Sequence, residues 1–182
     1  WSRSVEGSEL EEPGYVPGEE IYDWTTAPSG ETRELELEFE AGRPVALDGE
    51  DLDPVTLIET LNDVARAHGV GRTDVMEDRM LGLKVRENYE HPAATVLLNA
   101  HEALESLVLT KEERQFKNGI DQEWAEKGYQ GLVDAPLVRA LEGFIDETQE
   151  RVSGTVTIRL EGGQARPVGR TSPYAVYSAE AA

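Results

Sequence analysis

Residues 69–92, GVGRTDVMEDRMLGLKVRENYEHP, bring cationic and anionic side chains close together in a stretch without a Ser or Cys nucleophile. The cations, Arg72, Arg79, Lys84 and Arg86, could bind an anionic group, and the carboxylates could accept hydrogen bonds from a cationic one. No helical period runs through the stretch and three glycines interrupt it, so we expect a polar connection between helices. Because a connection of this length inside a compact domain is usually functional, we predict a binding surface whose ligand these residues do not specify.

Other kinds of site are missing from the sequence or only weakly indicated. No G-x-x-x-x-G-K-[ST] phosphate-binding loop occurs, and the GVGRTD segment lacks the third glycine and the preceding strand of a dinucleotide-binding motif. The histidines, His68, His91 and His101, do not have metal-ligand spacing, and His68 is better interpreted as a helix cap than as a catalytic residue. Glu77 and Asp78 could form an acid/base pair, but neighbouring carboxylates are weak evidence in a chain with 37 acidic residues.

Helix signals lie on both sides of this stretch and must position it. Asp53-Pro54 predicts an N-cap followed by proline at the first helical position, and Gly69 is expected to close that helix at its C′ position. Pro92 is predicted to begin a second helix, Thr110 a third through a capping box, and residue 134 a fourth. The apolar positions predicted to face inward are Trp124 and Tyr129 in the third helix and Leu137, Leu141, Phe144 and Ile145 in the fourth.

The strand signals predict an α+β fold. Glu34–Glu40 alternates apolar and acidic residues, which is typical of a half-buried strand, and residues 44–47 return as its hairpin partner. A second hairpin is predicted from residues 156–160 and 165–169. We therefore expect an antiparallel sheet built from hairpins, with helices packed on it. The likeness of the two hairpins favours two similar halves sharing one sheet, although chance similarity of short hairpins explains it equally well.

The composition limits the partners that the chain can have. The sequence has 182 residues, consistent with one domain, and its 37 acidic and 17 basic residues give a net charge of −20. Such a charge opposes nucleic acids and anionic membranes, so neither is expected as a partner. Arginine supplies 13 of the basic residues and lysine only 4, and an acidic surface low in lysine is typical of halophilic proteins.

The sequence also bears on the compartment. No cysteine is present, which excludes disulfides and thiolate chemistry. No apolar run approaches the roughly 20 residues of a membrane span, and no signal-peptide pattern occurs, so a cytoplasmic protein is expected. Because the sequence begins with Trp1 and not with Met, we expect it to be a piece of a longer polypeptide.

Residues 68–92 follow the order H-G-V-G-R-x-D-x-x-E-x-R-x-x-G-x-K-x-R-x-x-Y-E-x-P. This order resembles the C-terminal synthetase domain of the argininosuccinate synthase family. The likeness continues through residues 1–12 (WSRSVEGSELEE), 100–101, 148–154 (TQERVSG) and 168–177 (VGRTSPYAVY), so it covers nearly the whole chain. So many fixed positions in one segment, supported by collinear blocks, are far more specific than a lone glycine motif.

The resemblance implies an ATP-dependent ligase of arginine biosynthesis that joins citrulline to aspartate and gives argininosuccinate, AMP and diphosphate. In this family ATP activates the ureido oxygen of citrulline, and the aspartate amine then displaces AMP. The family's ATP signature, S-G-G-x-D-T-S, does not occur here, so ATP with Mg²⁺ and aspartate are expected to bind an N-terminal half outside this sequence. The chain alone is expected to be inactive and to supply citrulline contacts and oligomer surface, because the family forms homotetramers.

Carried onto this sequence, the resemblance places Ser4, Glu77 and Tyr89 in the citrulline site. A carboxylate such as Glu77 can accept a charge-assisted hydrogen bond from the α-ammonium group, and the Ser4 and Tyr89 hydroxyls can bond the amino-acid end or the ureido group. From its residue type alone, Glu77 would be interpreted as a solvated carboxylate and Tyr89 as a core or rim aromatic. No catalytic residue or metal ligand is assigned, and the roles of the four cations stay open.

The chain departs from the family pattern at two places, where K-S-R-G is replaced by Lys84-Val85-Arg86-Glu87 and T-P-G-G by residues 91–94 (HPAA).

We expect residues 1–32 to form an extended segment that carries the end of a substrate loop, and residues 33–182 to form the synthetase/multimerisation domain. The alternative function is a non-catalytic binding or assembly domain that keeps this fold. An S-G-G-x-D-T-S segment upstream of Trp1 would decide for the enzyme.

Overall fold

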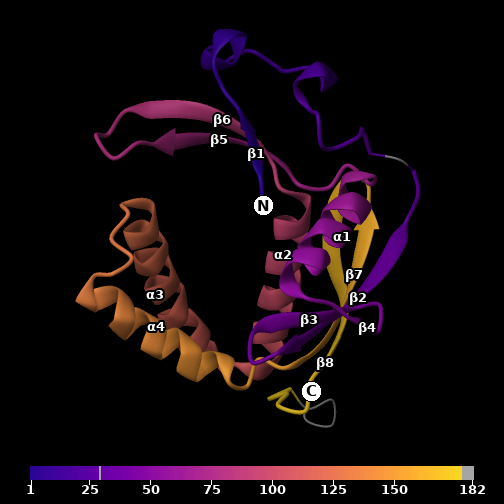
Figure 1. Ribbon diagram of the computed structural model, residues 1–182, viewed down its shortest axis with the longest axis vertical. Helices are drawn as coiled ribbons and strands as arrows, with labels where there is room; N and C mark the ends of the chain where they lie inside the picture. Colours follow the sequence, from indigo (N-terminus) through magenta and orange to yellow (C-terminus); the bar gives the residue numbers. More distant parts are fainter. Residues whose placement is uncertain (29, 178–182) are drawn as a thin grey trace.

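Five strands form the larger antiparallel sheet, β2 (Arg33–Glu40), β3 (Arg43–Leu47), β4 (Glu50–Asp51), β7 (Gly154–Glu161) and β8 (Gln164–Thr171). The structure is a computed structural model and describes residues 1–28 and 30–177. The strand order is β4-β3-β2-β7-β8, with β2 paired to both β3 and β7 (Figure 1). The two predicted hairpins are therefore confirmed, and they lie side by side in one sheet.

Helices α1 (Pro54–Arg66) and α2 (Pro92–Val108) pack on this sheet and close the main hydrophobic core. Inward residues of the paired strands, such as Leu37 opposite Val156, meet Leu57 and Leu61 of α1 and are fully buried. Burying one such leucine contributes about 1.5–3 kcal/mol, so the alternating pattern of β2 is sufficient to orient the sheet.

The ends of α1 form as their residue types predict. The Asp53 carboxylate accepts hydrogen bonds from the N–H groups of Val55 at 3.0 Å and Thr56 at 3.2 Å, which satisfies two otherwise unpaired donors of the first turn. The helix ends at Arg66, and Gly69 follows in the left-handed region with φ 71°. His68 Nδ1 lies 2.9 Å from the carbonyl oxygen of Val64, in agreement with its interpretation as a cap.

A smaller antiparallel sheet contains β1 (Arg3–Val5), β5 (Arg72–Asp78) and β6 (Lys84–Glu90) in the order β1-β6-β5. The prediction of an irregular connection over residues 69–92 is therefore wrong, because most of it is a β-hairpin. Its turn is closed by the Arg79 N–H, which donates to the Leu83 carbonyl at 2.8 Å. The two strands form an antiparallel backbone ladder, and the side chains paired across it include the charged pairs Lys84–Asp78 and Arg86–Asp74. Because apolar residues do not alternate along either strand, no strand period is visible in the sequence.

Helices α3 (Lys111–Tyr129) and α4 (Pro136–Gln149) pack against each other and extend away from the larger sheet, on the same side as the β5–β6 hairpin (Figure 1). The predicted capping box at Thr110 and Glu113 is confirmed. The prediction of inward-facing residues in α3 and α4 is partly wrong, because Trp124 is 41% exposed and Tyr129 and Leu137 are exposed as well. In α4 the neighbouring Val138 is buried instead, together with Leu141, while Phe144 and Ile145 are half-buried.

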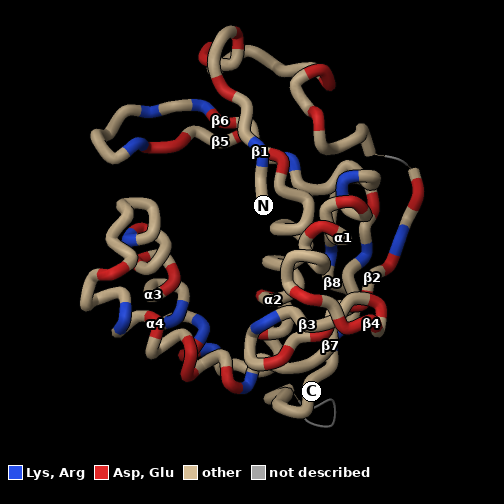
Figure 2. Tube along the Cα trace, viewed as in Figure 1, with Lys and Arg blue, Asp and Glu red and all other residues tan. Residues whose placement is uncertain are grey.

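The observed architecture is thus α+β, with antiparallel sheets and helices packed on the larger one, as the sequence predicts. Acidic side chains are distributed over almost every element of the chain (Figure 2). Among the described residues, no helix combines the length and the apolar character needed to span a membrane.

Candidate functional site

The three residues assigned to the citrulline site by the resemblance lie on the smaller sheet, one on each strand. Ser4 of β1 is paired directly with Tyr89 of β6, and Glu77 of β5 is paired with Val85 of β6. Directly opposed residues project to the same side of a sheet, and so do residues two apart on one strand. Ser4, Glu77 and Tyr89 therefore share one face, although they are up to 85 positions apart in the sequence.

A hydrogen bond joins two of these side chains. The Tyr89 hydroxyl donates to Oε1 of Glu77 across the hairpin. Partial burial, with the neighbouring Glu77 carboxylate, raises the pKa of Tyr89 above its usual range, so the phenol remains a donor at neutral pH. The other carboxylate oxygen, Oε2, has only a loose ion pair with Arg79 Nη1 at 3.9 Å. This arrangement leaves one oxygen of Glu77 able to accept a hydrogen bond from a cationic ligand.

The pair faces a cavity of about 580 Å³ between the hairpin and the C-terminal end of α3. Such a volume is large enough for an amino acid, because ligand pockets commonly measure about 300–1,000 Å³. Ser4 is not among the residues that line it; it lies beside Tyr89 on the neighbouring strand. The lining residues are Glu77, Asp78, Arg79, Met80, Tyr89, Glu126 and Tyr129.

Five of these residues, all except Glu126 and Tyr129, belong to the 68–92 segment on which the resemblance was based, and the comparison with known proteins agrees with it. A family model described as "Arginosuccinate synthase C-terminal domain" matches residues 1–182. The chain belongs to this family. The initial resemblance is therefore confirmed at the level of the family and of the domain.

Curated relatives named argininosuccinate synthase match the chain over its whole length. The chain is 81% identical over 182 residues to the protein of Natronomonas pharaonis. The match includes 100% of this chain and 46% of that protein. It is 70% identical to the protein of Haloarcula marismortui, of which it covers 44%, and 57% identical to that of Methanocaldococcus jannaschii, of which it covers 46%. The chain thus spans about half the length of the curated relatives that it matches.

Two of the arginines whose roles the sequence left open brace the N-terminal segment against the hairpin. Arg86 is buried, pairs with Asp74 at 2.5 Å, and donates to the carbonyl oxygens of Glu12 and Tyr15, both at 3.0 Å. Hydrogen bonding to Arg86 lowers the pKa of Asp74, which keeps this pair charged. Because Arg86 is buried between the hairpin and the N-terminal segment, it does not line the cavity beside Glu77 and Tyr89.

Arg72 performs a similar bracing role at the other end of the hairpin. Its guanidinium donates to both carboxylate oxygens of Glu19 at 2.9 Å and to the Thr25 hydroxyl at 2.7 Å, and it stacks on the Tyr22 ring at 3.8 Å. Lys84 differs, because it is exposed and pairs with Asp78 at 2.6 Å on the outer part of the hairpin. None of these three cations contacts Glu77 or Tyr89 in the structure as described.

Glu90 is the most buried charged residue beside the site, with 1% of its surface exposed. Its carboxylate pairs with Arg3 at 2.8 Å and accepts hydrogen bonds from the N–H groups of Asp23 at 3.1 Å, Trp24 at 3.0 Å and Thr25 at 2.7 Å. Burial acts to raise the pKa of Glu90, but these hydrogen bonds and the one from the Thr25 hydroxyl outweigh it, so the pKa is lowered. Glu90 thereby fixes the N-terminal segment onto β6.

The histidines serve local structure. His91 lies between two threonines, with Nε2 2.9 Å from Thr73 Oγ1 and Nδ1 2.8 Å from Thr95 Oγ1, and His101 Nε2 is 2.7 Å from Gln149 Oε1. Within residues 1–28 and 30–177, no group of three or more His, Asp or Glu side chains is placed to hold a metal ion.

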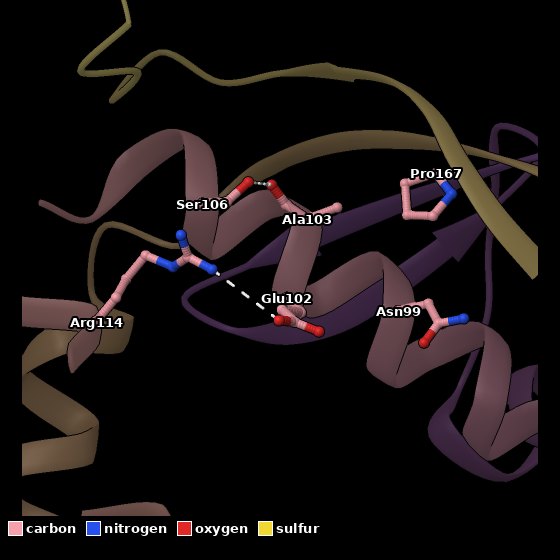
Figure 3. Close-up of a pocket in the computed structure, with 6 residues that line it drawn as sticks. All are labelled: Asn99, Glu102, Ala103, Ser106, Arg114 and Pro167. Atoms are coloured by element: carbon pink, nitrogen blue, oxygen red, sulfur yellow. Dashed lines mark hydrogen bonds and ion pairs between the residues drawn. The ribbon is translucent and has the colours of Figure 1, made fainter. Parts of the chain in front are cut away.

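A second hollow, of about 290 Å³, lies where α2, α3 and β8 meet (Figure 3). Arg114 reaches across it towards Glu102 at 4.0 Å, and the Ser106 hydroxyl donates to the carbonyl of Ala103 at 2.6 Å. Its polar groups are thus engaged with each other, and no residue assigned to citrulline lines it.

Sequence reasoning missed two carboxylates next to the site, Glu6 and Glu87, which both pair with Arg79. Glu87 lies two residues before Tyr89 on β6 and therefore shares its face. A strand interpretation of residues 84–90 would have placed Glu87 beside the site, whereas only the folded chain brings Glu6 to the same point.

Proposed function

We propose that this chain is the part of an argininosuccinate synthase that binds citrulline, through Ser4, Glu77 and Tyr89. The observation that carries the proposal is the hydrogen bond from Tyr89 to Glu77 at the wall of a cavity of about 580 Å³. Both residues are fixed positions of the sequence pattern by which the chain resembles the family. The function of the complete protein would be to join citrulline and aspartate to give argininosuccinate, AMP and diphosphate at the expense of ATP.

The proposed roles follow from the geometry of the carboxylate. Tyr89 occupies Oε1 of Glu77, so Oε2 would accept the charge-assisted hydrogen bond from the α-ammonium group of citrulline. The Ser4 hydroxyl, on the neighbouring strand, would bond either the amino-acid end or the ureido group. Holding one end of the substrate in this way would orient the ureido oxygen for reaction with ATP.

ATP with Mg²⁺ and aspartate would bind residues of the longer polypeptide outside this chain.

We also propose a homo-oligomer, a tetramer as in the family. Exposed apolar side chains support this part of the proposal, because a soluble monomer rarely leaves large ones together in water. On the hairpin these are Met76, Met80, Leu81 and Leu83, and on the α3–α4 pair they include Phe116, Trp124, Tyr129, Leu132 and Val133.

The rival proposal is a non-catalytic binding or assembly domain with the same fold. Assay of the full-length protein with ATP, Mg²⁺, citrulline and aspartate separates the two. Formation of argininosuccinate with one AMP per product supports the ligase. Citrulline binding by calorimetry without any product, in the presence of all substrates, would favour the rival.

A further inference from the structure

One guanidinium group, that of Arg79, connects all three strands of the smaller sheet. Arg79 Nη2 lies 2.5 Å from Oε1 of Glu87, on β6, and 3.3 Å from Oε2 of Glu6, which directly follows β1. Its Nη1 lies 3.9 Å from Oε2 of Glu77, on β5. Three carboxylates, from β5, from β6 and from the residue that follows β1, therefore surround one cation.

The burial of these groups determines which of the three pairs is strongest. The Glu87 side chain is only 4% exposed, and its Oε2 has no hydrogen-bond partner among the described residues. A carboxylate in such a place requires a close counter-ion, because burying an unpaired charge costs several kcal/mol. Burial and the neighbouring Glu6 raise the pKa of Glu87, which agrees with a carboxylate that depends on Arg79 for its charge. Of the three carboxylates, Glu87 therefore binds Arg79 most strongly and Glu77 only loosely, and Tyr129 is a further neighbour of the guanidinium.

The same cation also tethers the edge strand that carries Ser4. β1 has only three residues and pairs with a single neighbour, β6. Side chains hold it at both ends, through Arg3 with Glu90 at 2.8 Å on one side and Glu6 with Arg79 at 3.3 Å on the other. Ser4 lies between these two tethers, opposite Tyr89.

We propose that Arg79 and Glu87 are positioning residues, which hold Ser4 and Glu77 in register around the ligand and keep the Arg79 charge away from Glu77. The proposal rests on the function proposed above. Without Glu87, the Arg79 guanidinium loses its nearest carboxylate and is free to pair with Glu77 Oε2, the oxygen that the ligand's ammonium group would use.

The test uses the full-length enzyme and separates binding of citrulline from binding of the other substrates. Glu87→Ala removes the carboxylate, Glu87→Gln keeps an oxygen that can accept from Arg79, and Arg79→Lys keeps the charge without the forked donors. We expect Glu87→Ala to raise the citrulline KM about threefold to thirtyfold, which lies within the range for coupled neighbouring residues, with little change in kcat or in the KM for ATP and aspartate. Glu87→Gln should restore part of the affinity.

A double-mutant cycle distinguishes a positioning device from general loss of stability. In an Arg79→Gln background, Glu87→Ala should have little further effect on the citrulline KM, because the charge that would otherwise pair with Glu77 is already absent. Additive effects, or an equal rise in the KM of all three substrates, would overturn the proposal. Glu34→Ala is the matched control, because Glu34 forms an Arg–Glu pair with Arg159 at 2.6 Å across the strands of the other sheet.

The Glu77→Gln and Glu87→Ala variants together distinguish failure of the positioning role from failure of the proposed citrulline site. If Glu77→Gln weakens citrulline binding and Glu87→Ala does not, the positioning role is overturned and the citrulline site stands. If neither variant changes citrulline binding by calorimetry, both proposals are overturned.

Discussion

Tyr89 and Glu77 are joined by a hydrogen bond across the β5–β6 hairpin, although they are 12 residues apart in the sequence. The bond occupies one oxygen of Glu77, and both residues line the cavity between the hairpin and α3. From its residue type alone, Glu77 would be interpreted as a solvated carboxylate. In the folded chain, the hydrogen bond from the partly buried Tyr89 phenol fixes its position.

Tyr89→Phe should weaken citrulline binding less than loss of the Glu77 charge. A hydrogen bond from a neutral hydroxyl group to a carboxylate is removed, while the carboxylate itself remains, so we expect the citrulline KM of the full-length enzyme to rise about threefold to tenfold. Steady-state kinetics with varied citrulline measure this change. A Tyr89→Phe enzyme that loses ATP and citrulline affinity equally would argue against a specific role for the hydroxyl.

Acid should destabilise the domain through Glu90. Its pKa is lower in the folded chain than in the unfolded one, so its stabilising contribution is complete above the unfolded pKa of about 4.3 and is lost as the pH falls through the folded value. Asp74, whose pKa is also lowered, acts in the same direction. We expect the melting temperature of the chain to fall in this acid range.

Glu90→Gln is the variant that tests this assignment. It should lower the free energy of unfolding at pH 7 by about 1.5–3 kcal/mol, because Arg3 loses its buried partner and keeps only the exposed Asp23 as a charged partner, and it should flatten the loss of stability in acid. Urea unfolding at pH 7 and at pH 4 measures both effects. An acid profile that remains as steep in Glu90→Gln as in the parent protein would assign the effect to other carboxylates.

Salt should stabilise the chain. A net charge of −20 on 182 residues repels itself in the folded state, and salt shortens the range of this repulsion from about 10 Å at 0.1 M to about 3 Å at 1 M. We expect the melting temperature to rise steeply with KCl up to the molar range. An unchanged melting temperature between 0.1 M and 2 M KCl would contradict the interpretation of the acidic surface as an adaptation to salt.

Local signals were enough to predict much of the larger sheet and its helices. The alternation in β2, the Asp53 cap of α1 and the capping box at Thr110 depend on residues close in the sequence, and each appears in the structure. The inward face of α3 and α4 was less predictable. These two helices pack mainly on each other, so apolar residues such as Trp124 remain exposed.

The site hairpin could not be recognised from periodicity, because its buried positions are polar. Arg86, Asn88 and Glu90 are all buried on β6, and Arg86 and Glu90 bind the N-terminal segment. Glu77 and Tyr89 were assigned to the site only through the family pattern. The contact of Glu6 with Arg79 joins positions 73 residues apart, and no local rule predicts such a pair.

The central claim, that this hairpin binds citrulline, is tested most directly by Glu77→Gln in the full-length enzyme. The substitution keeps the shape of the side chain and removes the charge that would meet the ammonium group, and a charged hydrogen bond contributes about 1.5–3 kcal/mol. The citrulline KM should therefore rise about tenfold to a hundredfold, with the ATP KM much less affected. Glu40→Gln, at an exposed position at the end of β2 in the other sheet, should leave both constants unchanged. Unaltered citrulline kinetics in Glu77→Gln, or equal damage to the ATP and citrulline constants, would contradict the assignment.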